Sequence, residues 1–180
     1  MIFTPSLTGE TTLRSRPDAF LSALERRVEA GLLTGHPHPR SRYAITSRGG
    51  DRLAFGAENR LTAFNVGLND VEVVLDTPGR LRYRIEYWRW ARYSLGLSAV
   101  IGIALCLVFL SIDLPRYMET HPGSTVRGLS VRENLALAWG MAIFWGLVWP
   151  WIGIAVHKGP VRRLFERIVA EVDAAPGPSR

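Results

Sequence analysis

Residues 93–112 read YSLGLSAVIGIALCLVFLSI, a stretch of 20 residues without a charged side chain. A helix of that length spans roughly 30 Å, the thickness of the hydrocarbon core of a bilayer. Residues 135–156 read LALAWGMAIFWGLVWPWIGIAV, a second uncharged stretch of 22 residues. A large soluble protein can bury helices of this kind, but a chain of 180 residues has too little other material to cover two of them. We therefore expect two transmembrane helices.

The average composition conceals these two stretches. The chain is 47% hydrophobic and 21% charged, with a mean hydropathy of +0.07, which are values typical of a soluble globular protein. The 17 glycines, 11 prolines and single cysteine exclude a collagen-like repeat and a disulfide scaffold, and the hydrophobic content excludes wholesale disorder. Charge is concentrated outside the apolar stretches, so the sequence predicts a membrane hairpin joined to polar segments.

The fold class that we expect is an α-helical transmembrane hairpin of two spans, fused to a small N-terminal α+β domain. The expected segments are a cytoplasmic domain (1–92), a first transmembrane helix (93–112), an extracytoplasmic loop (113–134), a second transmembrane helix (135–156), and a cytoplasmic amphipathic helix with a disordered tail (157–180).

Basic residues indicate the orientation of the hairpin. The first ten residues are polar and do not form a signal peptide. Three bases lie in the connecting loop, whereas nine lie near the membrane on the side of the two termini. The nine are Arg80, Arg82, Arg84, Arg89, Arg92, Lys158, Arg162, Arg163 and Arg167. The positive-inside rule therefore places both termini in the cytoplasm and predicts a two-pass protein of the plasma (inner) membrane.

Two sets of side chains are expected at the membrane interface. Tryptophan prefers this depth, which predicts an aromatic belt of Trp88, Trp90, Trp149 and Trp151. Basic side chains gain about 1 kcal/mol each from an anionic leaflet, which favours headgroup contacts by Arg89, Arg92, Lys158, Arg162 and Arg163. His157 adjoins the second set, and we expect it at the same depth.

Small residues recur at every fourth position of both apolar stretches. Such rows let two helix backbones approach closely, so we expect them to face each other in the hairpin or to face a neighbouring subunit. The rows are Ser98, Gly102 and Cys106 in the first stretch, and Ala138, Ala142 and Gly146 in the second. An alternative explanation of these rows is that glycine and alanine are common in membrane helices.

The ends of the apolar stretches carry helix signals. Asp113 and Pro115 end the first stretch. Ser130 and Glu133 have the spacing of a capping box before the second. Pro150 is expected to kink or end the second helix near its last residues.

The N-terminal region has the pattern of one helix followed by strands. Phe20, Leu21, Leu24, Val28 and Leu32 share one helical face, and Gly35 is a plausible stop. Strands are expected at 43–48, 52–57, 61–66, 71–75 and 81–88, with turns at glycine or proline between them, and 11–14 is a candidate for an additional strand before the helix. The region therefore predicts a helix covering an antiparallel meander of four to five strands.

The last segment has the pattern of an amphipathic helix that begins at Gly159 and Pro160. Its apolar residues recur at helical spacing, and they are Val161, Leu164, Phe165, Ile168 and Val172. Such a helix can lie in the headgroup layer of the membrane or dock on the cytoplasmic sheet, and the sequence favours neither.

No residue pattern points to catalysis, a cofactor or a metal. The phosphate-loop, nucleophile-elbow and zinc-protease motifs are missing. His36 and His38 form an incomplete ligand set and are interpreted as part of a linker, Cys106 as a packing residue, and Asp113 as a helix end. Of the 22 bases, 21 are arginine, which indicates a codon bias rather than a nucleic-acid partner.

The hypothesis favoured by the sequence is a non-catalytic, membrane-anchored binding or scaffolding module that contacts the lipid bilayer and a protein partner or a second copy of itself. The alternative is a membrane-bound enzyme or lipid-handling protein with a ligand cavity in the N-terminal domain. A deep pocket with convergent polar groups would favour the alternative, and a filled core beside a flat exposed face would favour the binding module.

Overall fold

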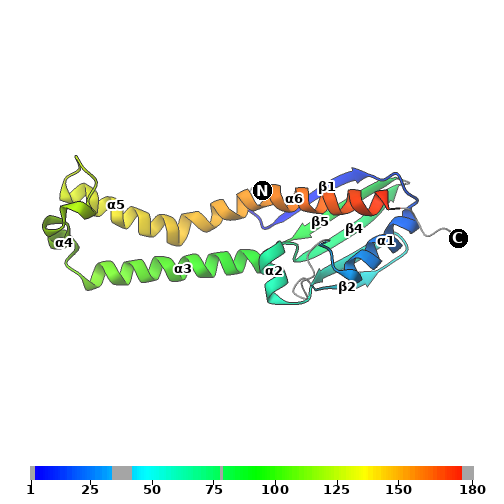
Figure 1. Ribbon diagram of the computed structural model, residues 1–180, viewed down its shortest axis with the longest axis horizontal. Helices are drawn as coiled ribbons and strands as arrows, with labels where there is room; N and C mark the ends of the chain where they lie inside the picture. Colours follow the sequence, from blue (N-terminus) through cyan, green and yellow to red (C-terminus); the bar gives the residue numbers. More distant parts are fainter. Residues whose placement is uncertain (1–2, 34–41, 78, 176–180) are drawn as a thin grey trace. The chain divides into compact units, whose positions relative to one another are not determined.

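The computed structural model describes residues 3–33, 42–77 and 79–175 (Figure 1). The chain divides into two units: the first consists of Met1–Ala91 together with Ile154–Arg180, and the second of Arg92–Gly153. Residues from both ends of the sequence therefore build the first unit. His36, His38 and Gly35 lie outside the described residues, as does the end of the C-terminal tail.

The first unit contains a five-stranded antiparallel sheet, as the sequence predicts. Its strands are β1 (Ser6–Thr12), β2 (Tyr43–Arg48), β3 (Arg52–Ala57), β4 (Asp70–Thr77) and β5 (Arg80–Glu86). The order across the sheet is β1-β5-β4-β3-β2, so β2 to β5 form a meander and β1 pairs with the last strand of that meander. β1 precedes the first helix in the sequence, in the region where the sequence analysis suggested a shorter strand at 11–14.

One face of the sheet is buried and the other is exposed. In β5 the side chains of Leu81, Tyr83 and Ile85 are buried, whereas those of Arg82 and Arg84 are exposed. This alternation follows from the pleat, which points successive side chains to opposite faces. We call the buried side the inner face and the exposed side the outer face.

Helix α1 (Pro17–Ala30) covers the inner face over β2 and β3. Phe20, Leu24 and Val28 are buried, at the positions that the helical pattern predicted. The helix begins at Pro17, where a missing N–H costs no hydrogen bond. It ends before Gly31, whose φ of 100° favours glycine.

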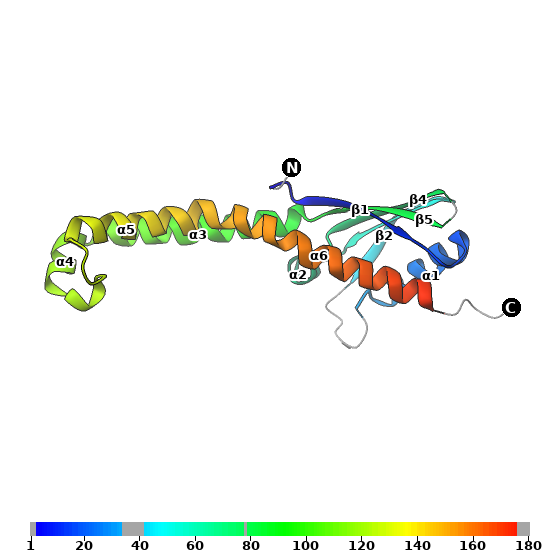
Figure 2. The same ribbon diagram turned by 90° about the horizontal axis from the view of Figure 1, so that it is seen from above.

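Helix α6 (Trp149–Ala174) docks on the same inner face, which answers a question that the sequence left open. Val161, Phe165 and Ile168 are buried, and the Phe165 ring lies 4.8 Å from the Tyr83 ring, centroid to centroid. The Tyr83 hydroxyl donates a 2.7 Å hydrogen bond to Glu166. Figure 2 shows α1 and α6 on one side of the sheet. The apolar face of this helix from Val161 to Val172 is therefore packed against protein.

Asp173 fastens the end of α6 to the segment between β1 and α1. Its carboxylate accepts hydrogen bonds from the N–H groups of Arg14 and Ser15 and from the Ser15 hydroxyl, at 2.6 to 3.2 Å. Burial alone would raise the pKa of this carboxyl, but the hydrogen bonds outweigh it and lower the pKa below its usual value.

The strand predicted at 61–66 is wrong, because this segment is helix α2 (Arg60–Val66). Asn59 caps the helix by accepting a 2.8 Å hydrogen bond from the N–H of Thr62, and Gly67 ends it with a φ of 74°. Periodicity cannot distinguish a strand from a short helix in an apolar run of this length. Asn59 before the segment and Gly67 after it were the sequence signals that could have identified a helix.

Two further boundaries differ from the prediction. β5 ends at Glu86, and helix α3 (Trp88–Ser111) begins five residues earlier than the uncharged stretch. Gly159 and Pro160 do not open a helix, because both lie inside α6, which continues through them. Because each helix extends beyond its apolar stretch, α3 and α6 reach into the first unit without an intervening loop.

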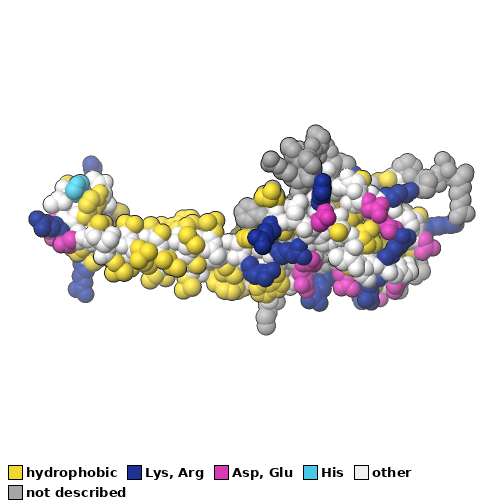
Figure 3. All heavy atoms as spheres, turned by 90° about the horizontal axis from the view of Figure 1, so that it is seen from below, with side chains coloured by type: hydrophobic (Ala, Val, Ile, Leu, Met, Phe, Trp, Pro, Cys, Tyr) yellow, Lys and Arg dark blue, Asp and Glu magenta, His cyan; other side chains and the backbone are white. Residues whose placement is uncertain are grey.

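The second unit consists mainly of two long apolar helical segments. The helix α5 (Val131–Ile143) continues through the π-helical turn η2 (Phe144–Val148) into α6, while α4 (Leu114–Thr120) and the short turn η1 (Pro122–Ser124) follow α3. Both long segments are long and apolar enough to cross a membrane, and only 11% of the residues in each apolar part are buried. Figure 3 shows hydrophobic side chains along them. A core helix of a soluble protein would be mostly buried.

The ends of these helices follow from local chemistry. Ser130 and Glu133 form the capping box that their spacing predicted. Asp113 caps α4 by accepting a 3.2 Å hydrogen bond from the N–H of Arg116. Pro150 does not end the helix; instead the wider turn η2 precedes it. A wider turn relieves the clash between a proline ring and the carbonyl group four residues earlier.

The backbones of α3 and η2 touch at two glycines. A Cβ atom added to Gly102 would lie 2.7 Å from the Cα atom of Gly146, and one added to Gly146 would lie 2.9 Å from the Cα atom of Gly102. Ser98 and Ala142 are buried beside them, whereas Cys106 and Ala138 are half-buried. The Phe109 and Trp139 rings pack edge to face at 5.5 Å.

We expect Gly102→Leu to destabilise the helix pair, because no side chain fits between the two backbones. Overpacking of this kind costs about 1–3 kcal/mol. Gly96→Leu is the matched control, since a Cβ atom there meets nothing within 4 Å. The measurement is the thermal unfolding midpoint of the purified protein in detergent. Equal midpoints for the two variants would show that the glycine contact contributes nothing to stability.

Candidate functional site

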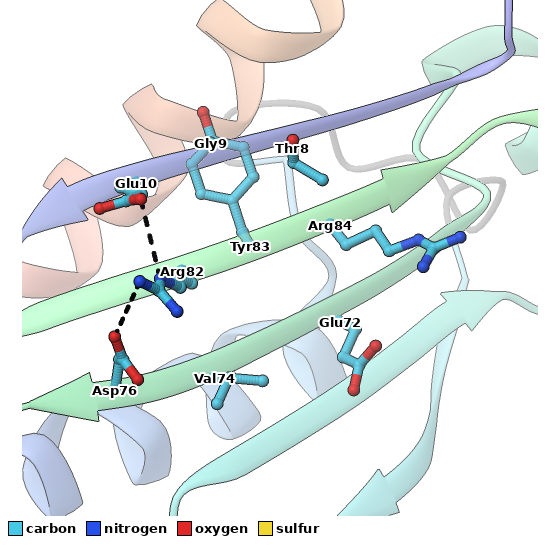
Figure 4. A pocket seen from close by; sticks show the side chains of 9 residues that line it. All are labelled: Thr8, Gly9, Glu10, Glu72, Val74, Asp76, Arg82, Tyr83 and Arg84. Atoms are coloured by element: carbon cyan, nitrogen blue, oxygen red, sulfur yellow. Dashed lines mark ion pairs between the residues drawn. The ribbon is translucent and has the colours of Figure 1, made fainter.

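The outer face of the sheet carries a shallow depression of about 490 Å³ (Figure 4). Three neighbouring strands line it, because β1 and β4 flank β5 in the sheet. Its lining residues are Thr8, Gly9, Glu10, Glu72, Val74, Asp76, Arg82, Tyr83 and Arg84. A second depression of about 330 Å³ adjoins it and shares Glu72 and Arg84. Together they form one broad surface, which we call the outer-face depression.

Arginines and carboxylates alternate across this surface. Arg82 lies between Glu10, at 3.7 Å, and Asp76, at 3.1 Å (Figure 4). The strand register explains the first pair, since Glu10 is directly opposite Arg82. Arg84 pairs with Glu86 on its own strand at 2.6 Å.

These ion pairs are accessible to a partner. Their charged side chains are all more than one-third exposed. Exposed ion pairs contribute little to stability, so their members can exchange one partner for another at low cost. The surface is suited to recognising a complementary pattern of charges. It holds no histidine or cysteine that would provide a nucleophile or proton-transfer group near neutral pH.

A third depression, of about 500 Å³, lies between α1 and the turn that joins β2 to β3. Asp18, Arg48 and Arg52 supply its charges, and Gly49 and Gly50 form its rim. Among the described residues, no group of three or more histidine, cysteine or carboxylate side chains is arranged to hold a metal ion.

A second cluster of side chains joins α6 to the first turn of α3, inside the first unit. The His157 ring stacks on the Trp90 ring with a centroid distance of 4.0 Å and an interplanar angle of 1°, and it meets the Tyr87 ring edge to face at 5.4 Å. The Tyr87 hydroxyl donates a 3.0 Å hydrogen bond to the carbonyl of Ile154. Gly67 approaches the imidazole so closely that a side chain there would collide with it. We call these residues the His157 cluster.

The His157 cluster leaves one polar atom buried. Within the part of the chain that the structure describes, the Nε2 atom of His157 has no hydrogen-bond partner. Burial lowers the pKa of this imidazole below its usual value, because a proton on Nε2 would be poorly solvated. Burial likewise raises the pKa of the Tyr87 hydroxyl to about 12. Both groups are therefore neutral at pH 7.

The tryptophans predicted for the membrane interface fall into two groups. Trp88, Trp149 and Trp151 are exposed. Trp90 is half-buried and stacked on His157, and its backbone N–H donates a 2.9 Å hydrogen bond to the Asn69 side-chain oxygen. Its position is thus explained by packing within the domain.

Some of the basic residues predicted to contact lipid headgroups likewise bond to other residues of the protein. Arg89 donates a 2.6 Å hydrogen bond to the carbonyl of Ala57 and lies 3.4 Å from Asp70. Arg162 reaches the carbonyl of Thr8 at 3.4 Å. Arg92 and Arg163 are exposed, and Lys158 is half-buried.

Comparison with known proteins identifies no relative: no protein-family model, curated protein or solved structure matches the chain significantly.

The structure identifies functional candidates that the sequence analysis missed. The outer-face depression combines residues from three strands, and the His157 cluster combines residues 67, 87, 90 and 157. The alternation of arginines with apolar residues in β5 was a sequence signal for the outer-face depression. For the second, no spacing in the sequence relates Trp90 to His157.

We expect the protein to lose stability as the pH falls from about 7.5 to 5.5, because of His157. In the unfolded chain the imidazole titrates near 6.5, and in the folded protein its pKa is lower. Unfolding therefore takes up a proton in this window, and acid favours the unfolded state. The measurement is the thermal unfolding midpoint at several pH values, compared with His157→Gln, which cannot take up that proton.

The matched control is His121→Gln, because His121 is an exposed histidine. We expect His157→Gln to flatten the pH dependence between 7.5 and 5.5 and His121→Gln to retain it. An unchanged slope in His157→Gln would contradict the assignment.

Proposed function

We propose that this chain is an integral protein of the inner membrane whose cytoplasmic domain is a non-catalytic binding or scaffolding module. Exposed apolar helices support the membrane location. Large hydrophobic side chains such as Leu97, Val100, Leu107 and Leu110 are exposed along α3, and Leu137, Ile143 and Leu147 are exposed in the second apolar segment. Exposed apolar surface of this extent is unfavourable in water and favourable in a lipid bilayer.

The proposed orientation rests on the distribution of charge. Both termini are placed in the cytoplasm, and the residues between the two spans, which include α4, are placed outside. Nine bases flank the apolar stretches on the terminal side, against three in the connecting segment.

The observation that carries the binding proposal is the difference between the two faces of the sheet. The inner face is filled by α1 and α6, with Phe165, Leu24 and Leu81 fully buried. The outer face is covered by no described element, and its ion pairs are exposed. A filled core beside an open charged face suits recognition of a partner surface.

The partner that we propose is a protein surface, either another protein or a second copy of this chain, that presents alternating charges. The outer face has arginines in β5 bordered by carboxylates of β1 and β4. That balance of charge is poorly suited to nucleic acid, which requires an excess of bases. The alternative function, an enzyme or lipid-handling protein, requires a cavity that encloses its ligand. The depressions described above are open to solvent.

We expect a reporter enzyme that is active only outside the cytoplasm to be active when it is inserted at Gly123, which lies between the two spans. The same reporter fused after residue 180 should be inactive, because the C-terminus is proposed to be cytoplasmic. Activity at the C-terminus without activity at Gly123 would reverse the orientation, and equal activity at both positions would contradict two spans.

We expect a photo-crosslinking amino acid at Thr8 to capture a protein in native membranes. Thr8 is exposed and lines the outer-face depression. Ala19 is the matched control, because it is exposed on α1, away from the outer face. Adducts should form from position 8 and weaken with Arg82→Glu, which removes the pairs with Glu10 and Asp76.

Three other results would overturn the binding proposal. Identical adducts from positions 8 and 19 would indicate random collision. No adduct from either position would show that the outer face is unoccupied. A lipid adduct at position 8 would favour the lipid-handling alternative.

A further inference from the structure

Three segments of the first unit meet at the end of the sheet where α3 begins. The N–H of Tyr87 donates a 2.9 Å hydrogen bond to the carbonyl of Pro5, which fixes the residues before β1 to the start of α3. The N–H of Ala57 donates a 2.7 Å hydrogen bond to the carbonyl of Asn69. Arg89 in turn bonds to Ala57. We call this end of the unit, with the N-terminal segment, α2 and the first turn of α3, the helix-bearing end.

The C-terminal helix reaches the same end. His157 stacks on Trp90, and Ile154 accepts the hydrogen bond of Tyr87. Val156 lies between these two residues in α6. The helix-bearing end is thus assembled from four segments that are far apart in the sequence, and each is held to another by a defined contact.

Exposed apolar side chains of the first unit are confined to this end. Among its described residues, the large hydrophobic side chains that are exposed are Phe3 (53%), Leu61 (59%), Trp88 (47%) and Val156 (67%). Each belongs to a different one of the four segments. The outer face and the opposite end of the sheet expose none. Single exposed hydrophobic residues are ordinary, but their restriction to one end of a domain indicates a contact surface.

We infer that the helix-bearing end is a lipid-contacting surface, on which Phe3 and Leu61 enter the interfacial layer of the bilayer together with Trp88 and Val156. This inference rests on the proposed function, since it requires that α3 and α6 continue into the membrane. Trp88 is the first residue of α3, and Val156 is the last residue of the second apolar stretch. Phe3 and Leu61 come from elements that do not cross the membrane, and the hydrogen bonds above bring those elements to the same end.

The apolar side chains, rather than net charge, provide the attraction. Arg60 adjoins Leu61 in the sequence and Glu58 lies three residues before it, and both are exposed. Arg89 is already paired with Asp70. A surface of this type suits the interfacial layer, where apolar side chains reach the acyl boundary and charged ones remain among the headgroups. A soluble partner would have to enter between the domain and the bilayer to reach it.

The test measures the depth of spin labels in the full-length protein in lipid nanodiscs. Cys106 is the only cysteine, so Cys106→Ala provides a background for single labels. Labels are placed by Leu61→Cys and, separately, by Phe3→Cys. Both positions are exposed, so that the substitutions leave the core intact. Collisions with oxygen, which concentrates in lipid, are compared with collisions with a water-soluble nickel chelate.

Two control positions separate the possible outcomes. Asp51→Cys lies in the exposed turn between β2 and β3, at the opposite end of the sheet, and Ile103→Cys lies in the middle of α3. We expect labels at 3, 61 and 103 to favour oxygen and the label at 51 to favour the nickel chelate. A label at 103 that favours the chelate would overturn the proposed membrane spans.

If the label at 103 favours oxygen while the labels at 3 and 61 favour the chelate, the spans stand and the lipid-contacting surface is wrong. Labels at 3 and 61 that are shielded from both reagents would also overturn it, because they would show that a protein covers this end.

Discussion

The contact between Phe165 and Tyr83 holds together the two ends of the chain. Tyr83 faces inward from β5, where Gly9 of β1 is its cross-strand neighbour. The lack of a side chain at Gly9 lets the Tyr83 ring lie across β1, since a Cβ atom there would collide with it. The hydroxyl then reaches Glu166, and the ring packs on Phe165. A glycine in an edge strand is thereby linked to the docking of the C-terminal helix.

With α6 docked on the inner face, the remaining surfaces of the domain differ in chemistry. Once α1 and α6 cover the inner face, the surfaces of the sheet that remain are its outer face, its two ends and the edge strands β1 and β2. The outer face is charged and carries shallow depressions, whereas the helix-bearing end exposes apolar side chains. These surfaces suit different partners, a protein in the first case and a lipid interface in the second.

The sequence predicted much of this architecture where a single element determined its own pattern. The two apolar stretches, the capping box at Ser130 and the helical face of Phe20, Leu24 and Val28 are local signals, and the structure contains each feature. The segment at 61–66 was misjudged because its hydrophobicity suits a strand as well as a short helix. The continuation of α6 through Pro160 was missed because a proline within a helix resembles a helix start.

The candidate sites were less predictable, because they depend on contacts between distant residues. Nothing near His157 indicates that it stacks on Trp90, and its position beside Lys158 suggested a place at the membrane interface instead. The outer-face depression depends on the order β1-β5-β4, which places Glu10 next to Arg82. The sequence left the placement of β1 open, and with it the composition of that surface.

Because residues from both ends of the chain build the first unit, its core is completed late in synthesis. The ribosome makes the sheet and α1 first, then the two apolar stretches, and only afterwards the residues of α6 that fill the inner face. Until Val161, Phe165 and Ile168 emerge, the hydrophobic side of β1 and β5 has no cover. The domain cannot complete its core as an independent N-terminal unit, and in the topology that we propose its maturation is coupled to the passage of both apolar stretches through the insertion machinery. A chain that stalls during insertion would expose an unfinished core to chaperones and proteases.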